Sequence, residues 1–322
     1  MLFAIACFIH INILLANSLD FDDHDLENET ERIALPKLDM SYVICTKDGC
    51  KYVPLKTSSD VLAKQGPWEV MNEEAMSPHS RTKRKMFLPD NRLRLREQSV
   101  GRFPFNSAVA IRINGEVKCS GIALLRPRFY LTAAHCVQPD GVQKEIEVGV
   151  LHQYRAMQWA RVNDTRVPPI WSRRKVAMKK LRLKDYAVLE TTTPLPVTPM
   201  GIGYVGLNAK VQLQNNKTFM YFSAFDDEKR PDDLNMRFCK MLKVKYYRIF
   251  SRCDTVPKTA GAGIYVRMRN KETGKVERKV IAIATGDYGV KADQEYSVAL
   301  RITSRMYPHI CYFVTGSYNG CN

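Results

Sequence analysis

The chain has 322 residues, of which 45% are hydrophobic and 10% aromatic, so it can bury one large core or two moderate ones. This composition excludes a disordered polymer, and a formal net charge of +16 makes the chain strongly basic. The one long apolar run, Met1 to Ala16, is shorter than the about 20 apolar residues that a membrane-spanning helix needs.

The N-terminal apolar run is typical of a secretory signal peptide. Small residues follow it at Ala16-Asn17-Ser18, which predicts removal of residues 1–18 by cleavage after Ser18. Cys7 leaves with this segment, and the eight remaining cysteines are an even number, as an oxidising compartment favours. We therefore expect a secreted, extracellular protein without a transmembrane anchor.

Residues 19–84 form the next segment, which differs from the rest in charge. Residues 1–84 carry 13 acidic and 9 basic side chains, a net charge of −4, whereas residues 85–322 carry 20 and 40, a net charge of +20. The run Arg81-Thr82-Lys83-Arg84 at the junction predicts a proprotein-convertase site with cleavage after Arg84. Such cleavage would release or loosen an acidic pro-segment; a solvated basic linker is the alternative.

The pattern after Arg84 predicts β-structure. Apolar residues alternate with others along residues 109–113, 146–150 and 264–268, which is typical of half-buried strands. Residues 270–274 are expected to form a hairpin loop between strands at 264–269 and 276–285. Many short strands predict an all-β barrel or sandwich, and residues 307–314, with Pro308 suited to a first turn, predict one C-terminal helix.

Three sequences match the acceptor pattern for N-glycosylation, which is used only in the secretory route. They begin at Asn28, Asn163 and Asn216. Such triplets also arise by chance, so each is a candidate site only.

Four motifs occur in a fixed order along residues 85–322. They are Cys119-Ser120-Gly121, Leu131-Thr132-Ala133-Ala134-His135-Cys136, Lys184-Asp185-Tyr186-Ala187-Val188-Leu189 and the loop from Lys258 to Tyr265. The order, and a length of 238 residues, resemble a chymotrypsin- or trypsin-like serine protease domain. Segments such as 158–162, 167–171 and 263–268 resemble more narrowly the serine protease 23 and inactive serine protease 35 group. The resemblance implies a double antiparallel β-barrel with a C-terminal helix, and neither a cofactor nor a metal.

The resemblance assigns catalytic roles to His135 and Asp185. In such a site the histidine takes the proton of a serine hydroxyl, and the aspartate orients the ring and stabilises its cation. A lone histidine is more often a packing residue and a lone aspartate a turn residue, but the motifs outweigh those interpretations. The nucleophile position is Ala260, whose methyl group cannot attack a carbonyl. Thr259 stands where such chains have an aspartate.

The loop around Ala260 departs from the family in a second way. An oxyanion hole needs two convergent N–H groups, and the family usually has glycine at the position of Lys258. A side chain there resists positive φ, so we expect a reshaped turn, with Gly261 keeping the following backbone compact. An N-terminus freed at Lys85 would meet Thr259 and so find no charged partner.

The resemblance also implies a disulfide between Cys119 and Cys136. The other pairs are assigned by proximity alone, since eight cysteines allow many connectivities. They are Cys45 with Cys50, Cys239 with Cys253, and Cys311 with Cys321.

Candidate partners follow from charge and from the former substrate cleft. The basic surface favours sulfated glycosaminoglycans or other polyanions, although a merely soluble basic face explains it equally well. We do not expect nucleic acid, because no stacking platform or recognition helix is apparent. A peptide or protein could pair with the backbone near Thr285-Gly286, and Asp254 has the offset of the trypsin specificity aspartate. The bases are Arg173, Arg174, Lys175, Lys179, Lys180, Arg182 and Lys184, with Lys240, Lys243, Lys245 and Arg248 further on.

The sequence thus favours a secreted protease homologue that is catalytically inactive and serves a binding or regulatory role. One alternative is an active endopeptidase that uses Thr259 or a relocated serine. Another is a glycosaminoglycan- or matrix-binding protein that uses only its basic surface.

Overall fold

The computed structural model describes residues 40–55, 68–71, 92–137, 145–152, 156–172, 178–205, 218–227, 230–245, 247–285, 296–318 and 321. Backbone contacts divide the chain after Leu38, and Asp39–Asn322 form one compact unit. Several predicted features lie outside the described residues: the signal peptide with Ser18, the cleavage site at Arg84, Asn28, Asn216, residues 173–175 and Gly286.

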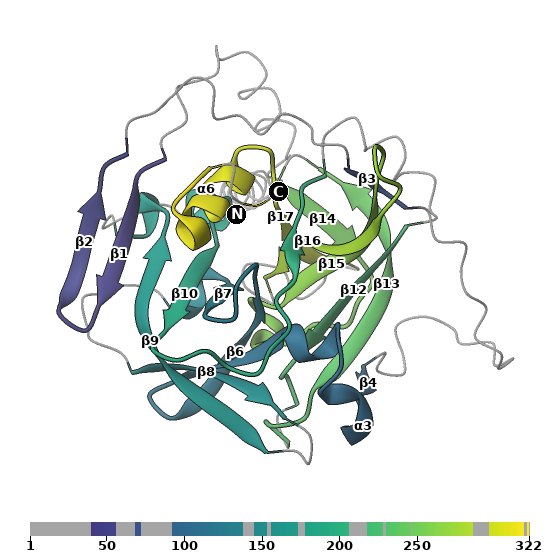
Figure 1. Cartoon of the computed structure of the whole chain (residues 1–322), viewed down its shortest axis with the longest axis horizontal. Coiled ribbons are helices and arrows are strands. Elements are labelled where there is room, and N and C mark those ends of the chain that lie inside the picture. Colours follow the sequence, from purple (N-terminus) through teal and green to yellow (C-terminus); the bar gives the residue numbers. More distant parts are fainter. Residues whose placement is uncertain are drawn as a thin grey trace, which may run out of the picture. The chain divides into compact units, whose positions relative to one another are not determined.

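The first barrel is built from six consecutive antiparallel strands (Figure 1). Their order is β10-β7-β6-β5-β8-β9, and pairing between β9 and β10 closes the ring. The strands are β5 (Ala108–Ile113), β6 (Glu116–Ala123), β7 (Phe129–Thr132), β8 (Ile146–Leu151), β9 (Met157–Val167) and β10 (Ala187–Thr191).

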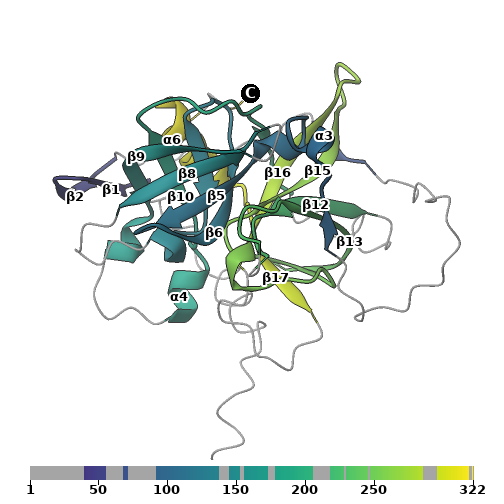
Figure 2. The ribbon, with the colours of Figure 1, turned by 90° about the horizontal axis from the view of Figure 1, so that it is seen from below.

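The second barrel lies beside the first and repeats its plan (Figure 2). Its order is β16-β17-β14-β13-β12-β15, closed by pairing of β15 with β16. β11 (Gly201–Ile202) and β4 (Leu93–Arg94) add to its edges. The two closed barrels confirm the predicted all-β fold class. The strands are β12 (Phe219–Ala224), β13 (Asn235–Val244), β14 (Arg248–Ser251), β15 (Gly263–Asn270), β16 (Val276–Ala284) and β17 (Ser297–Arg301).

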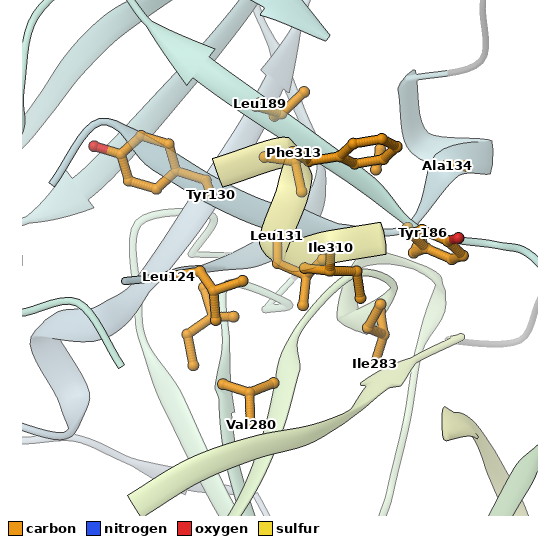
Figure 3. Close-up of a cluster of buried hydrophobic side chains, with 14 of the residues drawn as sticks. Leu124, Tyr130, Leu131, Ala134, Tyr186, Leu189, Val280, Ile283, Ile310 and Phe313 are labelled. Carbon is orange, nitrogen blue, oxygen red and sulfur yellow. The ribbon is translucent and has the colours of Figure 1, made fainter. Parts of the chain in front are cut away.

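The predicted C-terminal helix is α6 (Met306–Thr315), which ends at Gly316 in the left-handed region with a φ of 73°. Figure 3 shows its Phe313 near Leu189 and Tyr186 and its Ile310 near Leu131 and Ile283 of β16, all members of one buried cluster. The helix therefore fills the space where the two barrels share a core. The other helices are short: α3 (Glu97–Val100), α4 (Met178–Arg182), η1 (Phe105–Ser107), η2 (Ala134–Val137), η4 (Pro169–Ser172) and η5 (Pro257–Thr259).

The prediction of half-buried strands is wrong for β5. Its Val109 and Ala110 point to opposite faces, yet both are 0% exposed. Ala110 packs in a second cluster with Phe225 and Leu234, which belong to the other half of the chain. Alternation along one strand cannot reveal that a second barrel covers its outer face.

Two described parts of the segment before Arg84, residues 40–55 and 68–71, pair with the barrels. The hairpin of β1 (Tyr42–Thr46) and β2 (Gly49–Val53) pairs with β9, and β3 (Trp68–Val70) pairs with β15. The compact unit of the fold begins at Asp39. The boundary at 84/85 was predicted from the basic run at Arg81–Arg84, which lies outside the described residues, and it stays a prediction.

All four predicted disulfides are confirmed. They join Cys45 to Cys50, Cys119 to Cys136, Cys239 to Cys253, and Cys311 to Cys321. Among the described helices, none is long and apolar enough to span a membrane.

Phe313→Ala tests the packing of α6. Phe313 is 1% exposed, so its truncation should lower the free energy of unfolding by about 3–5 kcal/mol, measured by urea denaturation. Tyr52→Ala is the control: its ring is 51% exposed, and the change should cost no more than about 0.5 kcal/mol. Equal unfolding midpoints for the two variants would contradict this role of α6.

Candidate active site

His135 and Asp185 lie side by side because of how β7 and β10 pair. His135 follows the end of β7, Asp185 precedes the start of β10, and Thr132 pairs with Ala187 in the antiparallel ladder. The Nδ1 of His135 is 2.7 Å from Asp185 Oδ2, and the His135 backbone N–H donates to Asp185 Oδ1 at 2.9 Å. Because the carboxylate accepts Nδ1–H, this arrangement keeps Nε2 as the proton-accepting nitrogen.

Neighbouring contacts fix the segment around Asp185. The Trp171 indole N–H donates to the Lys184 carbonyl at 2.8 Å, and the Tyr186 hydroxyl lies 2.6 Å from His309 Nδ1 on α6. The Asp185 side chain itself is fully buried. Contacts of its two neighbours, Lys184 and Tyr186, thus fix the position of Asp185, and Asp185 fixes the ring of His135 through their hydrogen bond.

Ala260 sits at the end of η5, with 1% of its surface exposed. Its methyl group supplies neither a nucleophile nor a proton for His135. The adjacent Thr259 hydroxyl is engaged elsewhere: it donates to Asp226 Oδ2 at 2.7 Å and accepts the Val256 N–H at 3.1 Å. In this geometry the threonine supports the loop.

The backbone around Ala260 does not form the oxyanion hole that is usual in the family. The Ala260 N–H, one of the two donors that such a hole requires, donates instead to the Pro257 carbonyl at 3.1 Å. Lys258 lies within this tight turn and outside the left-handed region, since the described non-glycine residues with positive φ are Asn114 and Leu125. The turn is therefore reshaped, and a carbonyl oxygen faces the N–H group that would bind an oxyanion.

Ser120, on β6 of the first barrel, clamps this loop of the second barrel. Its hydroxyl donates to the Lys258 carbonyl at 3.0 Å and accepts the Phe225 N–H at 3.0 Å, while its own N–H donates to the Ala260 carbonyl at 2.8 Å. Gly261 has a φ of +86°, and a Cβ there would collide with Ser120 and with the Thr132 hydroxyl. Only glycine fits this contact between barrels.

A buried ion pair also contacts the loop that carries Ala260. Asp226 and Arg237 are fully buried and paired with each other, and Asn235 donates to Asp226 Oδ1 at 3.2 Å. The Asp226 carboxylate also accepts the Thr259 hydroxyl. None of the sequence motifs predicts this pair. The available signal was Arg237 itself, since the alternation along β13 turns it inward, where a charge needs a partner.

This ion pair bears on activation. The trypsin-like scheme uses a freed N-terminal ammonium as the buried cation beside the nucleophile loop. Here the guanidinium of Arg237 supplies a buried cation, and Asp226 links it to Thr259. Both side chains are present in the uncleaved chain, so the loop is held without a new N-terminus.

One group of metal-ligand types occurs among the described residues. Candidate ligand atoms of Cys119, His135 and Cys136 lie within 4.8 Å of one another. Both sulfur atoms are joined in a disulfide and are not the thiolates that bind metals. The group therefore does not make a metal site.

The remaining predicted residues differ in exposure, and Thr285 is buried. Asp254 is half-buried, and Asn163 is exposed on β9. The Thr285 hydroxyl donates to the Val298 carbonyl at 2.7 Å. Of the basic residues with described side chains, Lys180, Lys184, Lys240 and Lys243 are exposed, whereas Arg182, Lys245 and Arg248 are half-buried.

The barrels and the His135–Asp185 pair define a protein of the trypsin class. A family model described as Trypsin matches residues 94–290, and the chain belongs to that family. Serine protease 23 of Bos taurus is 32% identical over 275 residues, covering 77% of this chain and 70% of the relative. Inactive serine protease 35 of Bos taurus is 28% identical over 319 residues, covering 79% and 74%. The predicted family and group are thus confirmed.

The similarity extends in front of Arg84. Serine protease 23 of Homo sapiens is 31% identical over a stretch that covers 81% of this chain. Residues 85–322 are 238 of 322 residues, or 74%. The matched stretch therefore includes part of the acidic segment, in keeping with the strands that this segment adds to the barrels.

Solved structures support the fold. A Glu endopeptidase in complex with MPD superposes with a TM-score of 0.53 at 15% identity, covering 71% of this chain and 99% of that one. At this identity the comparison bears on architecture alone.

Asp226→Asn tests the buried ion pair. It leaves Arg237 buried without a counter-ion, so the free energy of unfolding should fall by about 3–5 kcal/mol. Asp232→Asn makes the same chemical change at an exposed position and should cost no more than about 0.5 kcal/mol. Chemical denaturation of both variants is the measurement, and a shift of the same size in both would show that the pair does not hold the loop.

Proposed function

We propose that this chain is a secreted, catalytically inert member of the trypsin family whose role is binding or regulation. The observation that carries the proposal is the geometry of Ala260, where a methyl group replaces the nucleophile and the backbone N–H is bonded to Pro257. Secretion is supported by the signal-like run at residues 1–16 and by four disulfides.

Two independent defects act on the same reaction. Without a hydroxyl at position 260, the imidazole of His135 has no nucleophile to activate, although Asp185 orients it as catalysis would require. Without the Ala260 N–H, a tetrahedral oxyanion would lose one of its two donors, which costs about 10²–10³-fold in rate. Restoring the serine alone therefore repairs only the first defect.

The names of the relatives are compatible with either an active or an inactive protein. One group is named a serine protease and the other an inactive serine protease. An active endopeptidase would use Thr259 or a relocated serine, and Thr259 would have to leave Asp226 and turn toward His135. That move would break a buried hydrogen bond, so inactivity is the better supported proposal.

Labelling with a fluorophosphonate probe tests inactivity. The wild-type protein should take up no probe under conditions that label trypsin fully, because a methyl group cannot be phosphonylated. Ala260→Ser should cleave a chromogenic peptide at least about 10²-fold more slowly than trypsin, since its N–H remains bonded to Pro257.

The control for peptide cleavage is the double variant Ala260→Ser with His135→Ala, which gives the background rate without the histidine. Wild-type labelling that disappears in Thr259→Val would establish the active alternative. Trypsin-like turnover by Ala260→Ser would show that the oxyanion site is intact.

Binding to a sulfated polyanion is a second candidate function. It is supported by the net charge of +20 on residues 85–322 and by the exposure of Lys180 and Lys184. Net charge alone retains many proteins on heparin, so the experiment must separate a specific cluster from general basicity.

Heparin chromatography of two charge-matched variants makes this separation. The cluster variant replaces Arg173, Arg174, Lys179 and Lys180 with Ala, and the control replaces Arg96, Arg126, Arg269 and Lys271, so each loses four positive charges. The cluster variant should elute at a clearly lower salt concentration than the control. Equal elution would rule out the cluster as a specific site.

A further inference from the structure

The acidic segment before Arg84 occupies strand edges on both barrels. β1 pairs with the end of β9, with Val43 opposite Val167 and Cys45 opposite Thr165. β8 pairs with the first half of β9, and β10 pairs with the opposite edge of β9. β1 therefore pairs with the second half of β9, beyond the end of its pairing with β8. Figures 1 and 2 show β1 and β2 along the outer side of β9.

Side chains of this segment enter the core of the first barrel. Met40 is 1% exposed and Val43 is 2% exposed, and Val43 belongs to the main hydrophobic cluster. The Tyr42 ring lies 5.1 Å from the ring of Phe313 on α6, and its burial raises the pKa of the Tyr42 hydroxyl. The first attachment therefore combines a strand ladder with buried apolar contacts.

The second attachment is on the other barrel. β3 pairs with β15 from Trp68 opposite Asn270 to Val70 opposite Met268, and the Met71 N–H donates to the Arg267 carbonyl at 3.0 Å. The ring of Trp68 lies 3.8 Å from the ammonium of Lys279 on β16, a cation–π contact that helps to leave Lys279 only 5% exposed.

Among the described cysteines, no disulfide links this segment to the chain after Arg84. Cys45 pairs with Cys50 inside the segment, and the three other bonds lie within residues 119–321. After cleavage at Arg84 the two pieces would be joined only by strand pairing, buried side chains and charge. Two attachments on one short chain raise each other's effective concentration, which favours retention.

We propose that the strands within residues 40–55 and 68–71 hold the segment before Arg84 on both barrels by β-addition after cleavage, so that the processed protein has two non-covalent chains. This differs from an activation peptide that is discarded, and it does not depend on whether the protein is catalytically active. The edges of β9 and β15 are thus covered by extended strands of the same chain. These strands bind through backbone hydrogen bonds, as in β-addition.

The experiment uses the full secreted chain with the recognition sequence of a site-specific protease inserted between Arg84 and Lys85. After complete cleavage, the two fragments should co-elute at 1:1 on gel filtration at physiological salt. They should also co-elute at 1 M NaCl, where the Debye length is about 3 Å and charge attraction is screened. In denaturant without reductant they should separate.

Paired variants locate the contacts. The double variant Val43→Asp with Trp68→Ala should release the fragment that precedes Arg84 after cleavage. The aspartate places a charge in the core of the first barrel, and the alanine removes the cation–π contact with Lys279 on the second barrel. Tyr52→Ala with Lys51→Ala, at exposed positions of β2, should leave the fragment bound. Separation of the wild-type fragments at physiological salt overturns the proposal, and separation only at 1 M NaCl would show that charge attraction alone holds that fragment.

Discussion

The buried pair of Asp226 and Arg237 is the constraint from which the state of the site follows. A carboxylate and a guanidinium removed from water must satisfy each other, and the second role of Asp226 is to accept the Thr259 hydroxyl. With Thr259 fixed in this way and Ser120 bonded to Lys258 and Ala260, the turn closes on itself. The donation from Ala260 to Pro257 is the outcome. The loop is thus stabilised in a form that lacks one oxyanion donor.

The retained part of the site fits the same picture. His135 and Asp185 are placed by the pairing of β7 with β10, which the first barrel needs in order to close. Asp185 accepts a backbone N–H as well as the imidazole N–H, so it also ties η2 to β10. The pair therefore has a structural role that does not require turnover. It can persist in a chain whose nucleophile is gone.

Much of the fold could be predicted from residues 85–322, because β5, β8 and β15 carry a two-residue apolar period and the disulfides join sequence neighbours. The positions of His135 and Asp185 followed from motifs. Contacts that depend on folding could not be predicted: Thr259 lies 33 residues from Asp226, and nothing local pairs them. The strand at Tyr42–Thr46 could not be placed either, because its partner is the edge of the distant strand β9 and no local signal pairs them.

The central claim is that the Ala260 N–H is turned inward and unavailable to a substrate. Amide hydrogen exchange of Ala260, followed by nuclear magnetic resonance, measures this directly, with Gly261 as reference because its N–H donates to the Ala284 carbonyl at 2.8 Å. The account predicts that Ala260 is protected to a degree similar to Gly261 and that an arylboronic acid leaves its resonance unchanged. An Ala260 amide that exchanges freely, or that shifts when the boronate is added, would show an open oxyanion site.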